Sequence, residues 1–196
     1  ETSQDILEVK AAIAGIHQAF AESGASLPVQ VQVTLDTTGR MLLGTDIGAA
    51  LAILEGLDID VIGLNCSTGP EHMREPIRVL GEQSTLPVSC IPNAGLPLNV
   101  DGQAVYPLEP EPFANDLYEF VTKYNVSVVG GCCGTTPEHM KLLVEKLDHH
   151  PHPARPLSTV SRLSSAISAT SMRQDPPPTL IGERCNARST HSRARA

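Results

Sequence analysis

The chain has 196 residues, of which 41% are hydrophobic and 3% aromatic, and it contains no tryptophan. This length suits one domain of ordinary size and falls short of the ~250 residues of a complete eight-stranded α/β barrel. The formal net charge is −8. Residues 1–148, here called the acidic body, lack the clustered Lys and Arg that bind phosphates, so we expect no nucleic-acid partner. No stretch approaches the ~20 apolar residues that span a bilayer, so we expect no membrane partner either.

The amino-terminal segment predicts an amphipathic helix over residues 2–20. Thr2 with Asp5 resembles a capping box at its start. Farther along, Thr45 is expected to cap a second helix that ends near Gly56. The apolar residues of the first helix recur at helical spacing and share one face: Ile6, Val9, Ile13, Ile16 and Phe20.

Strands alternate with helices along the rest of the acidic body. Parallel strands joined by right-handed helical crossovers form either an open doubly wound sheet or a barrel, and the pattern leaves both open. The first helix lacks a preceding strand and no initiator Met or export signal is visible, so we expect the interior of a longer polypeptide. Apolar runs predict strands at about 29–35, 61–64, 87–91 and 126–129.

The composition changes at His149. The following residues are rich in Pro, Ser and Ala and predict a linker, in which His149, His150 and His152 are interpreted as incidental. After the prolines a new strand and its exit loop are predicted, followed by a tail without apolar periodicity. The predicted domain organisation is residues 1–148, 149–178 and 179–196.

Two copies of one pattern, Cys-x-Thr-x-Pro-Glu-His-Met, begin at Cys66 and Cys133. Each copy follows an apolar run, and its Pro and Glu are typical of a first helical turn, so each predicts strand, loop and helix. Cys132 precedes the second copy directly. Three thiols are therefore expected at the carboxyl ends of parallel strands, where α/β folds build their sites.

The three thiols predict a catalytic zinc site, because three protein ligands with one open position are typical of such sites. Gly130-Gly131 supplies the bend that lets Cys132 and Cys133 reach one metal. Three thiolates leave the site with a net charge of about −1, which suits an exogenous thiol better than water. The predicted reaction is attack of a substrate thiolate on an electrophilic carbon. Inert cysteines and a strained vicinal disulfide are the alternatives.

Other candidate residues lie near the same strand ends. Cys90 is interpreted as a small core residue, and Asn93 either reaches the site or serves the turn that follows. His72 and His139 are expected to cap helices rather than bind metal. Glu1 would follow a missing strand and is a candidate for a substrate ammonium group. The odd number of five cysteines and the lack of an export signal favour reduced thiols and a cytoplasmic location.

Three separated motifs resemble the homocysteine-binding methyltransferase family: Gly-Leu-Asn-Cys-Ser at 63–67, Pro-Asn-Ala-Gly at 92–95 and Gly-Gly-Cys-Cys-Gly-Thr-Thr-Pro-Glu-His at 130–139. The resemblance covers residues 1–147. It implies a (β/α)8 barrel, present here as its carboxyl-terminal half of about four strands with their helices.

The resemblance also assigns roles to residues of the site. Zinc would be held by Cys66, Cys132 and Cys133. Glu1, in the Glu-Thr-x-x-Asp motif, would contact the amino group of homocysteine, and Asn93 would lie near the zinc.

Residues 180–187, Leu-Ile-Gly-Glu-Arg-Cys-Asn-Ala, resemble the start of the pterin-binding barrel in the cobalamin-dependent branch of this family. The implied reaction is methyl transfer from methylcobalamin to homocysteine, giving methionine. Cobalamin would be carried by a later module of the same polypeptide and recharged from methyltetrahydrofolate. The alternatives are a stand-alone homocysteine S-methyltransferase that uses betaine or S-methylmethionine, and a non-catalytic zinc-binding module. With half a barrel, the chain alone is expected to be inactive, and its tail after Ala187 departs from the family pattern.

Overall fold

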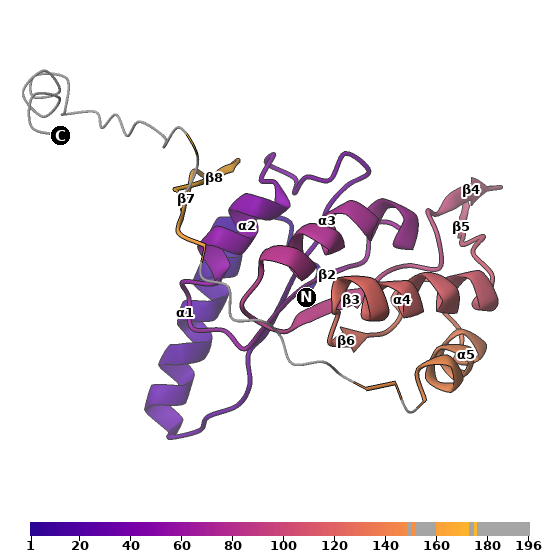
Figure 1. Ribbon diagram of the computed structural model, residues 1–196, viewed down its shortest axis with the longest axis horizontal. Helices are drawn as coiled ribbons and strands as arrows, with labels where there is room; N and C mark the ends of the chain where they lie inside the picture. Colours follow the sequence, from indigo (N-terminus) through magenta and orange to yellow (C-terminus); the bar gives the residue numbers. More distant parts are fainter. Residues whose placement is uncertain (149, 152–159, 173–174, 176–196) are drawn as a thin grey trace, which may run out of the picture.

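A computed structural model describes residues 1–148, 150–151, 160–172 and 175. Its centre is a four-stranded parallel sheet in the order β1-β2-β3-β6 (Figure 1). All four strands therefore end at the same edge of the sheet. The α/β class with parallel strands is thus confirmed. The strands are β1 (Gln30–Val33), β2 (Val61–Asn65), β3 (Val88–Ile91) and β6 (Val128–Val129).

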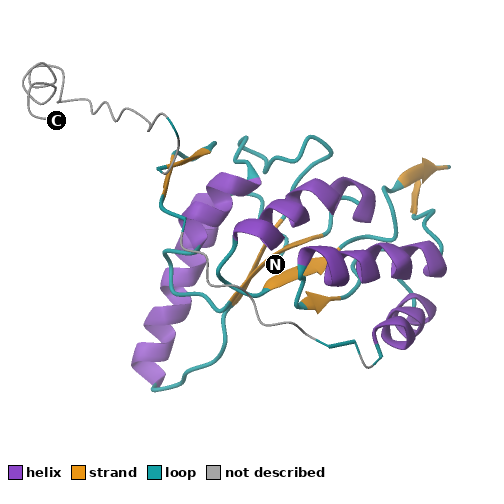
Figure 2. Ribbon diagram, in the orientation of Figure 1, coloured by secondary structure: helices purple, strands orange, loops and turns teal. Residues whose placement is uncertain are grey.

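Helices connect successive strands, and neighbouring helices contact one another in chain order from α2 to α5. In the view of Figure 2, α3 and α4 lie in front of the strands. None of the helices in the described part of the chain combines the length and the apolar character that a membrane crossing needs. The helices are α1 (Ile6–Ser23), α2 (Ile47–Leu54), α3 (Pro70–Gln83), α4 (Pro110–Tyr124) and α5 (Pro137–Leu147).

The two faces of the sheet differ in polarity. Residues that alternate along β2 and β3, such as Leu64 and Val88, belong to one apolar core together with residues of α3 and α4. On the opposite face Gln32, Gly63 and Ser89 are register partners across three strands. The Gln32 amide donates a hydrogen bond to Ser89 Oγ at 2.7 Å. The sheet therefore packs its apolar face against the helices and carries a polar face on the other side.

The first helix begins later than the sequence predicts. It runs from Ile6 to Ser23, and Asp5 alone caps it by accepting hydrogen bonds from the amides of Leu7 and Glu8. The predicted Thr2–Asp5 capping box is wrong because Asp5, and not Thr2, is the N-cap of the helix. Ser3 pairs in parallel with Val33 of β1, as a further strand of the sheet would.

Two short hairpins were not predicted. The β4–β5 hairpin, Leu98–Val100 with Gln103–Val105, lies between the strands predicted at 87–91 and 126–129 and projects from one end of the body (Figure 1). The β7–β8 hairpin, Arg162–Ser164 with Ala169–Ser171, lies within the predicted linker. Strands of three residues are too short for an alternating pattern to be recognised. His149, His152 and the predicted third segment, 179–196, lie outside the described residues.

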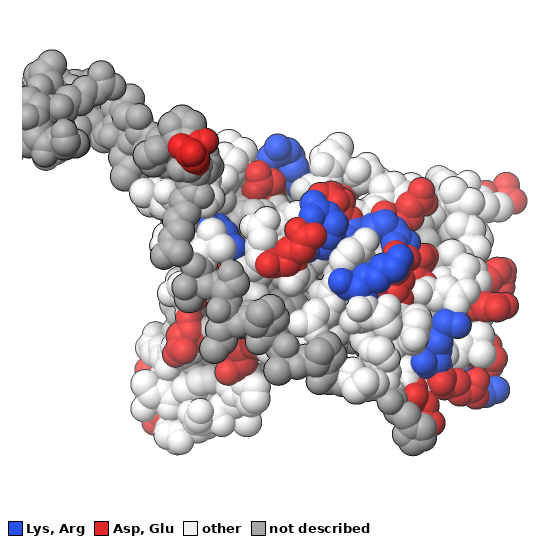
Figure 3. Space-filling view, in the orientation of Figure 1, with Lys and Arg blue, Asp and Glu red and all other residues white. Residues whose placement is uncertain are grey.

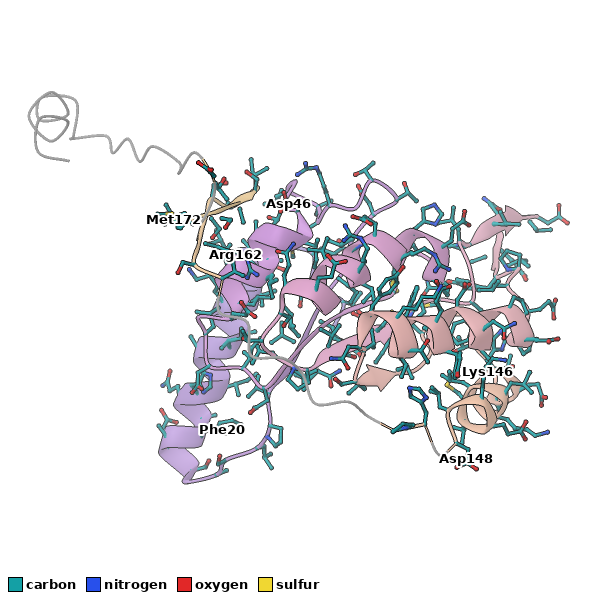
Figure 4. All side chains as sticks on the ribbon, in the orientation of Figure 1. Phe20, Asp46, Lys146, Asp148, Arg162 and Met172 are labelled. Atoms are coloured by element: carbon teal, nitrogen blue, oxygen red, sulfur yellow. The ribbon has the colours of Figure 1, made fainter. Side chains whose placement is uncertain are left out.

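The β7–β8 hairpin docks on α2 and α3 through buried polar contacts (Figure 4). The Arg162 side chain, only 7% exposed, forms an ion pair with Glu55 at 3.2 Å and donates to the last carbonyl of α3, Gln83 O, at 2.8 Å. Thr45 donates its hydroxyl to Ala166 O of the hairpin loop. The prediction that Thr45 caps α2 is therefore wrong, and Asp46 accepts the capping bond from Ala49 instead.

Charged side chains on the surface of α3 and α4 are paired with opposite charges. Figure 3 shows basic and acidic residues interspersed over this face. Arg74 of α3 bridges to Asp116 and Glu119 of α4, while Arg78 pairs with Glu residues of its own helix. The bridges of Arg74 join two neighbouring helices and help to fix the row of helices against the sheet.

We expect Arg162→Ala to release the hairpin, because the variant leaves Glu55 charged and partly buried without its cation. The free energy of unfolding should fall by about 1–3 kcal/mol. Amide hydrogen exchange over 162–171 should rise in parallel. Arg78→Ala, which breaks exposed pairs, is the control and should change stability little. Unchanged protection of 162–171 in Arg162→Ala would contradict this account of the docking.

Candidate metal centre

The structure brings three sulfur atoms together at the carboxyl edge of the sheet. Cys66 follows β2, and Cys132 and Cys133 follow β6. Cys133 Sγ lies 3.8 Å from Cys66 Sγ and 3.9 Å from Cys132 Sγ. All three sulfurs lie within 4.8 Å of one another. The pairing of strands in one parallel sheet therefore joins two segments that are far apart in the sequence.

These distances fit a tetrahedral zinc ion. With Zn–S bonds of about 2.3 Å, two sulfurs on a tetrahedral ion lie about 3.8 Å apart. The cluster therefore needs little movement to hold Zn²⁺. Among the described residues no fourth His, Cys, Asp or Glu joins the group. The protein donors thus account for three vertices of a tetrahedron and leave one for an exogenous ligand.

A sharp turn at the end of β2 positions Cys66. Cys66 and Ser67 both have left-handed backbone conformations, with φ of 61° and 65°. Such conformations cost roughly 1 kcal/mol or more for each residue with a side chain. The amide of Cys66 donates to Ile91 O at 3.1 Å and helps to hold the turn. Strained backbone beside a ligand cluster is typical of functional sites.

Two loops carry the thiols: the first cysteine loop follows β2 and contains Cys66, and the second follows β6 and contains Cys132 and Cys133. The loop after β3 joins them through backbone hydrogen bonds. The amide of Asn93 donates to Thr68 O at 3.0 Å, and that of Ala94 donates to Cys133 O at 2.9 Å. In the reverse direction, Cys132 donates its amide to Pro92 O at 2.8 Å. The position of one cysteine loop relative to the other is therefore set by residues 92–94.

Close backbone contact makes this arrangement depend on glycine. A Cβ atom on Gly69 would lie 2.6 Å from the Cα of Gly95, which is too close for any side chain. Gly95 itself has a left-handed φ of 88°. The first cysteine loop and the loop after β3 therefore pack backbone against backbone, as only glycine allows.

Asn93 supports the second cysteine loop with its side chain. It is 2% exposed, and its Oδ1 accepts a hydrogen bond from the amide of Cys133 at 3.1 Å. Both interpretations made from the sequence are thus compatible, because one residue serves the turn and also reaches the cluster. The contact shown is with the backbone of a candidate ligand.

The electrostatics differ among the three thiols. Burial raises the pKa of Cys132 to about 11, and its thiol neighbours add to this effect. Burial also acts to raise the pKa of Cys133, but the contacts with Cys66 and Cys132 and the neighbouring Tyr106 outweigh it and lower that pKa. Cys133 therefore ionises more readily than Cys132.

Tyr106 is a site residue that sequence reasoning missed. It follows β5 directly, and its ring lies where a Cβ atom on Gly134, the residue after Cys133, would be. Burial raises the pKa of Tyr106, and the neighbouring Cys133 raises it further. Nothing in the sequence links this residue to the cysteines, because the connection depends on how the β4–β5 hairpin folds back.

Glu1 lies near the same edge of the sheet because its neighbour Thr2 is bonded to Asn65. The amide of Thr2 donates to Asn65 Oδ1 at 2.7 Å, and Asn65 Nδ2 donates to Thr2 Oγ1 at 2.8 Å. Asn65 directly precedes Cys66. The exposed Glu1 side chain is not part of the group of three sulfurs. Its contact with a substrate stays a prediction.

The other candidates have structural roles. Cys90 is fully buried with its Sγ 3.9 Å from Met73 Sδ, which confirms the core assignment. His139 accepts a hydrogen bond from the amide of Thr136 at 3.1 Å and caps α5, as predicted. The capping role predicted for His72 is wrong, because the N-cap of α3 is Gly69 and no side chain caps this helix. His150 packs edge-on against the ring of Tyr118.

Comparison with known proteins places this site in a family. The sequence profile described as homocysteine S-methyltransferase matches residues 1–147. The chain belongs to this family. Methionine synthase from Mycobacterium tuberculosis is 45% identical over 187 residues, and that from Mycobacterium leprae is 44% identical over 192 residues. Each alignment covers 95% of this chain and 16% of the relative, so the chain spans about a sixth of their length.

Solved structures share the fold of the family member described here. The apo form of the homocysteine methyltransferase MmuM from Escherichia coli aligns with a TM-score of 0.56 and 21% identity, over 74% of this chain and 47% of that one. The metallated form of the same protein aligns with a TM-score of 0.50 and 19% identity, over 68% and 40%. At these identities the likeness concerns the fold.

We expect Cys66→Ala and Cys133→Ala each to abolish zinc retention, because two remaining thiols cannot complete the site. Zinc content would be measured by mass spectrometry of the purified protein after dialysis. Cys90→Ala is the matched control, since this thiol lies in the core and should leave equimolar zinc in place. Unchanged zinc stoichiometry in either ligand variant would rule out that ligand.

A second prediction concerns Asn93. Asn93→Ala leaves the amide of Cys133 without its partner and loosens the second cysteine loop, so zinc affinity should fall about 10–100-fold. Competition with a chromophoric chelator measures this affinity. Asn99→Ala, which removes an exposed turn contact in the β4–β5 hairpin, should bind zinc as the parent protein does. Equal affinity of the Asn93 variant and the parent would show that this bond does not organise the site.

Proposed function

We propose that this chain is the carboxyl-terminal half of a homocysteine-binding (β/α)8 barrel in a cobalamin-dependent methionine synthase. Its reaction is transfer of a methyl group to the thiol of homocysteine, giving methionine. The observation that carries the proposal is the cluster of three sulfurs at zinc-like spacing. The family of the chain and the identity to methionine synthases supply the substrate.

The residues of the site have separate tasks in this proposal. Cys66, Cys132 and Cys133 hold the metal, and Asn93 fixes the loop that carries two of them. Glu1 binds the ammonium group of homocysteine from the neighbouring strand end. When bound, zinc supplies a positive charge that keeps the substrate thiol ionised near neutral pH while its sulfur stays nucleophilic.

The chemical step is a displacement at a methyl carbon. The homocysteine sulfur forms a bond to this carbon while the bond between the carbon and the donor breaks, and the donor keeps the bonding electron pair. Three thiolate ligands favour this chemistry because their charge offsets that of the metal and leaves the fourth sulfur electron-rich.

Methylcobalamin is the proposed methyl donor, bound by another module of the same polypeptide and recharged from methyltetrahydrofolate. The curated relatives are methionine synthases about six times as long as this chain. Their 187 and 192 aligned residues exceed the 147 of the family match, so the similarity continues past the barrel. This continuation supports a linker at 149–178 and the start of a pterin-binding domain at 179–196.

The half-barrel proposal has its own support. Ser3 pairs with β1 as a preceding strand would, and the alignment covers 47% of the related Escherichia coli chain. The polar face of Gln32, Gly63 and Ser89 would then line the barrel interior. We expect the chain to need the remaining strands for turnover. Four free cysteines in the described part of the chain fit a reducing compartment, and we propose the cytoplasm.

Zinc X-ray absorption on a barrel-complete, zinc-loaded protein tests the proposed chemistry. The zinc should gain a fourth sulfur neighbour when homocysteine is added and should not when homoserine, its oxygen analogue, replaces it. A closed, non-catalytic module would show no change with either compound. Methionine formation with methylcobalamin supports the proposed donor, whereas formation with betaine or S-methylmethionine instead would favour the stand-alone enzyme.

A further inference from the structure

The two copies of the pattern Cys-x-Thr-x-Pro-Glu-His-Met place a histidine at the same position of two helices. His72 is the third residue of α3, and His139 is the third residue of α5. Their surroundings differ, because the N-cap of α3 is Gly69 and no side chain caps that helix. His139 is 5% exposed, and both of its ring nitrogens have partners. The second histidine therefore makes connections that the repeat alone does not explain.

The partners of His139 determine where the ring carries its proton. The backbone amide of Thr136 can only donate, so Nδ1 of His139, at 3.1 Å, is the acceptor. The carbonyl of Leu108 can only accept, so Nε2, at 2.9 Å, carries the proton and donates it. These two bonds need the neutral tautomer with its hydrogen on Nε2. One ring thus holds two backbone segments that are 28 residues apart in the sequence.

These two bonds complete a closed circuit of contacts around the second cysteine loop. The amide of Leu108 donates to Ala94 O at 3.0 Å, and the amide of Ala94 donates to Cys133 O at 2.9 Å. Along the chain, Cys133 is followed three residues later by Thr136, the partner of His139 Nδ1. The circuit therefore runs from Cys133 to Thr136, His139, Leu108 and Ala94 and back to Cys133. Within it, His139 contributes the one link made by a side chain.

The His139 ring is also fixed by the packing of two helices. It lies in the first turn of α5, and Leu108 lies two residues before α4. The two helices pack against each other (Figure 1). Phe113 of α4, which is fully buried, meets the imidazole edge-on with ring centroids 5.2 Å apart. The circuit is therefore anchored in the core, where a side chain has little freedom to move.

We propose that His139 is a positioning residue of the metal centre, which holds Cys133 at the distance from Cys66 that one zinc ion requires. This role rests on the proposed function, since it concerns how the zinc ligands are kept in place. Residues 92–94 hold the start of the second cysteine loop, and His139 holds its end. A ligand loop that is fixed at both ends loses less freedom when the metal binds, which favours binding.

Two variants separate the bond to Leu108 from the capping of α5. His139→Asn places an oxygen near the position of Nδ1, where it can accept from the amide of Thr136, but the side chain is too short to reach Leu108 O. His139→Gln places an amide nitrogen near the position of Nε2, from which it can donate to Leu108 O. His72→Asn, at the same position of the first copy, is the matched control. All variants are made in the full-length protein.

Zinc affinity is measured by competition with a chromophoric chelator. His139→Asn should bind zinc about 10–100-fold more weakly than the parent, as expected when a partner that orients a ligand is lost. His139→Gln should recover most of this loss, and His72→Asn should match the parent. In the zinc-free protein, amide hydrogen exchange over 132–136 should rise in His139→Asn, while the amides of α5 stay as protected as in the parent.

Three results would overturn this role. The first is equal zinc affinity of His139→Asn and the parent. The second is an equal loss of affinity in both His139 variants, because the bond to Leu108 would then not be the cause. The third is loss of protection throughout α5 in His139→Asn, which would show that the histidine stabilises the helix and does not position the loop.

The two proposals fail in different ways. If the parent protein binds no zinc, the proposed function fails, while exchange in the zinc-free protein still shows whether His139 holds residues 132–136. If the parent binds zinc and gains the fourth sulfur from homocysteine, but His139→Asn binds zinc as tightly, only the role of His139 is lost.

Discussion

Sulfur atoms from two distant segments must lie close enough to share one ion, and the rest of the structure serves this spacing. The parallel register of β2, β3 and β6 brings the segments to one edge. The loop at 92–94 then fixes them by backbone bonds in both directions and by the buried side chain of Asn93. Backbone contacts set the spacing more firmly than mobile side chains do, since they leave few torsions free.

The strand and helix order was predictable because long elements carry their own periodicity. The four strands lie close to the predicted ranges, and Ile6, Val9 and Ile13 of the predicted apolar face of α1 are buried. Ile16 of the same face is 38% exposed because the end of the helix extends beyond the sheet (Figure 1). Features defined by partners, such as the capping of α2 and both hairpins, carry no such signal.

The same distinction, between features with their own sequence signal and features defined by their partners, holds for the candidate site. The cysteines were recognisable because a repeated pattern marks the ends of two strands, and parallel strands end together. Tyr106 was not recognisable, since its place beside Gly134 depends on a hairpin of three-residue strands. The left-handed turn at Cys66 and Ser67 was not predictable either, because neither residue type indicates a positive φ. Sequence patterns therefore predict which thiols meet, and only the fold shows the turns and loops that position them.

The docked β7–β8 hairpin bears on how later modules are tethered. Because Arg162 fastens the hairpin to α2 and α3, the chain as far as Ser171 is held on the outer helices. From Ser171 to Thr179 the backbone spans at most roughly 28 Å when fully extended. In the proposed domain organisation, a second barrel that starts at Thr179 would be held close to the outer helices of the first. Such a short connection would raise the local concentration of one module at the other.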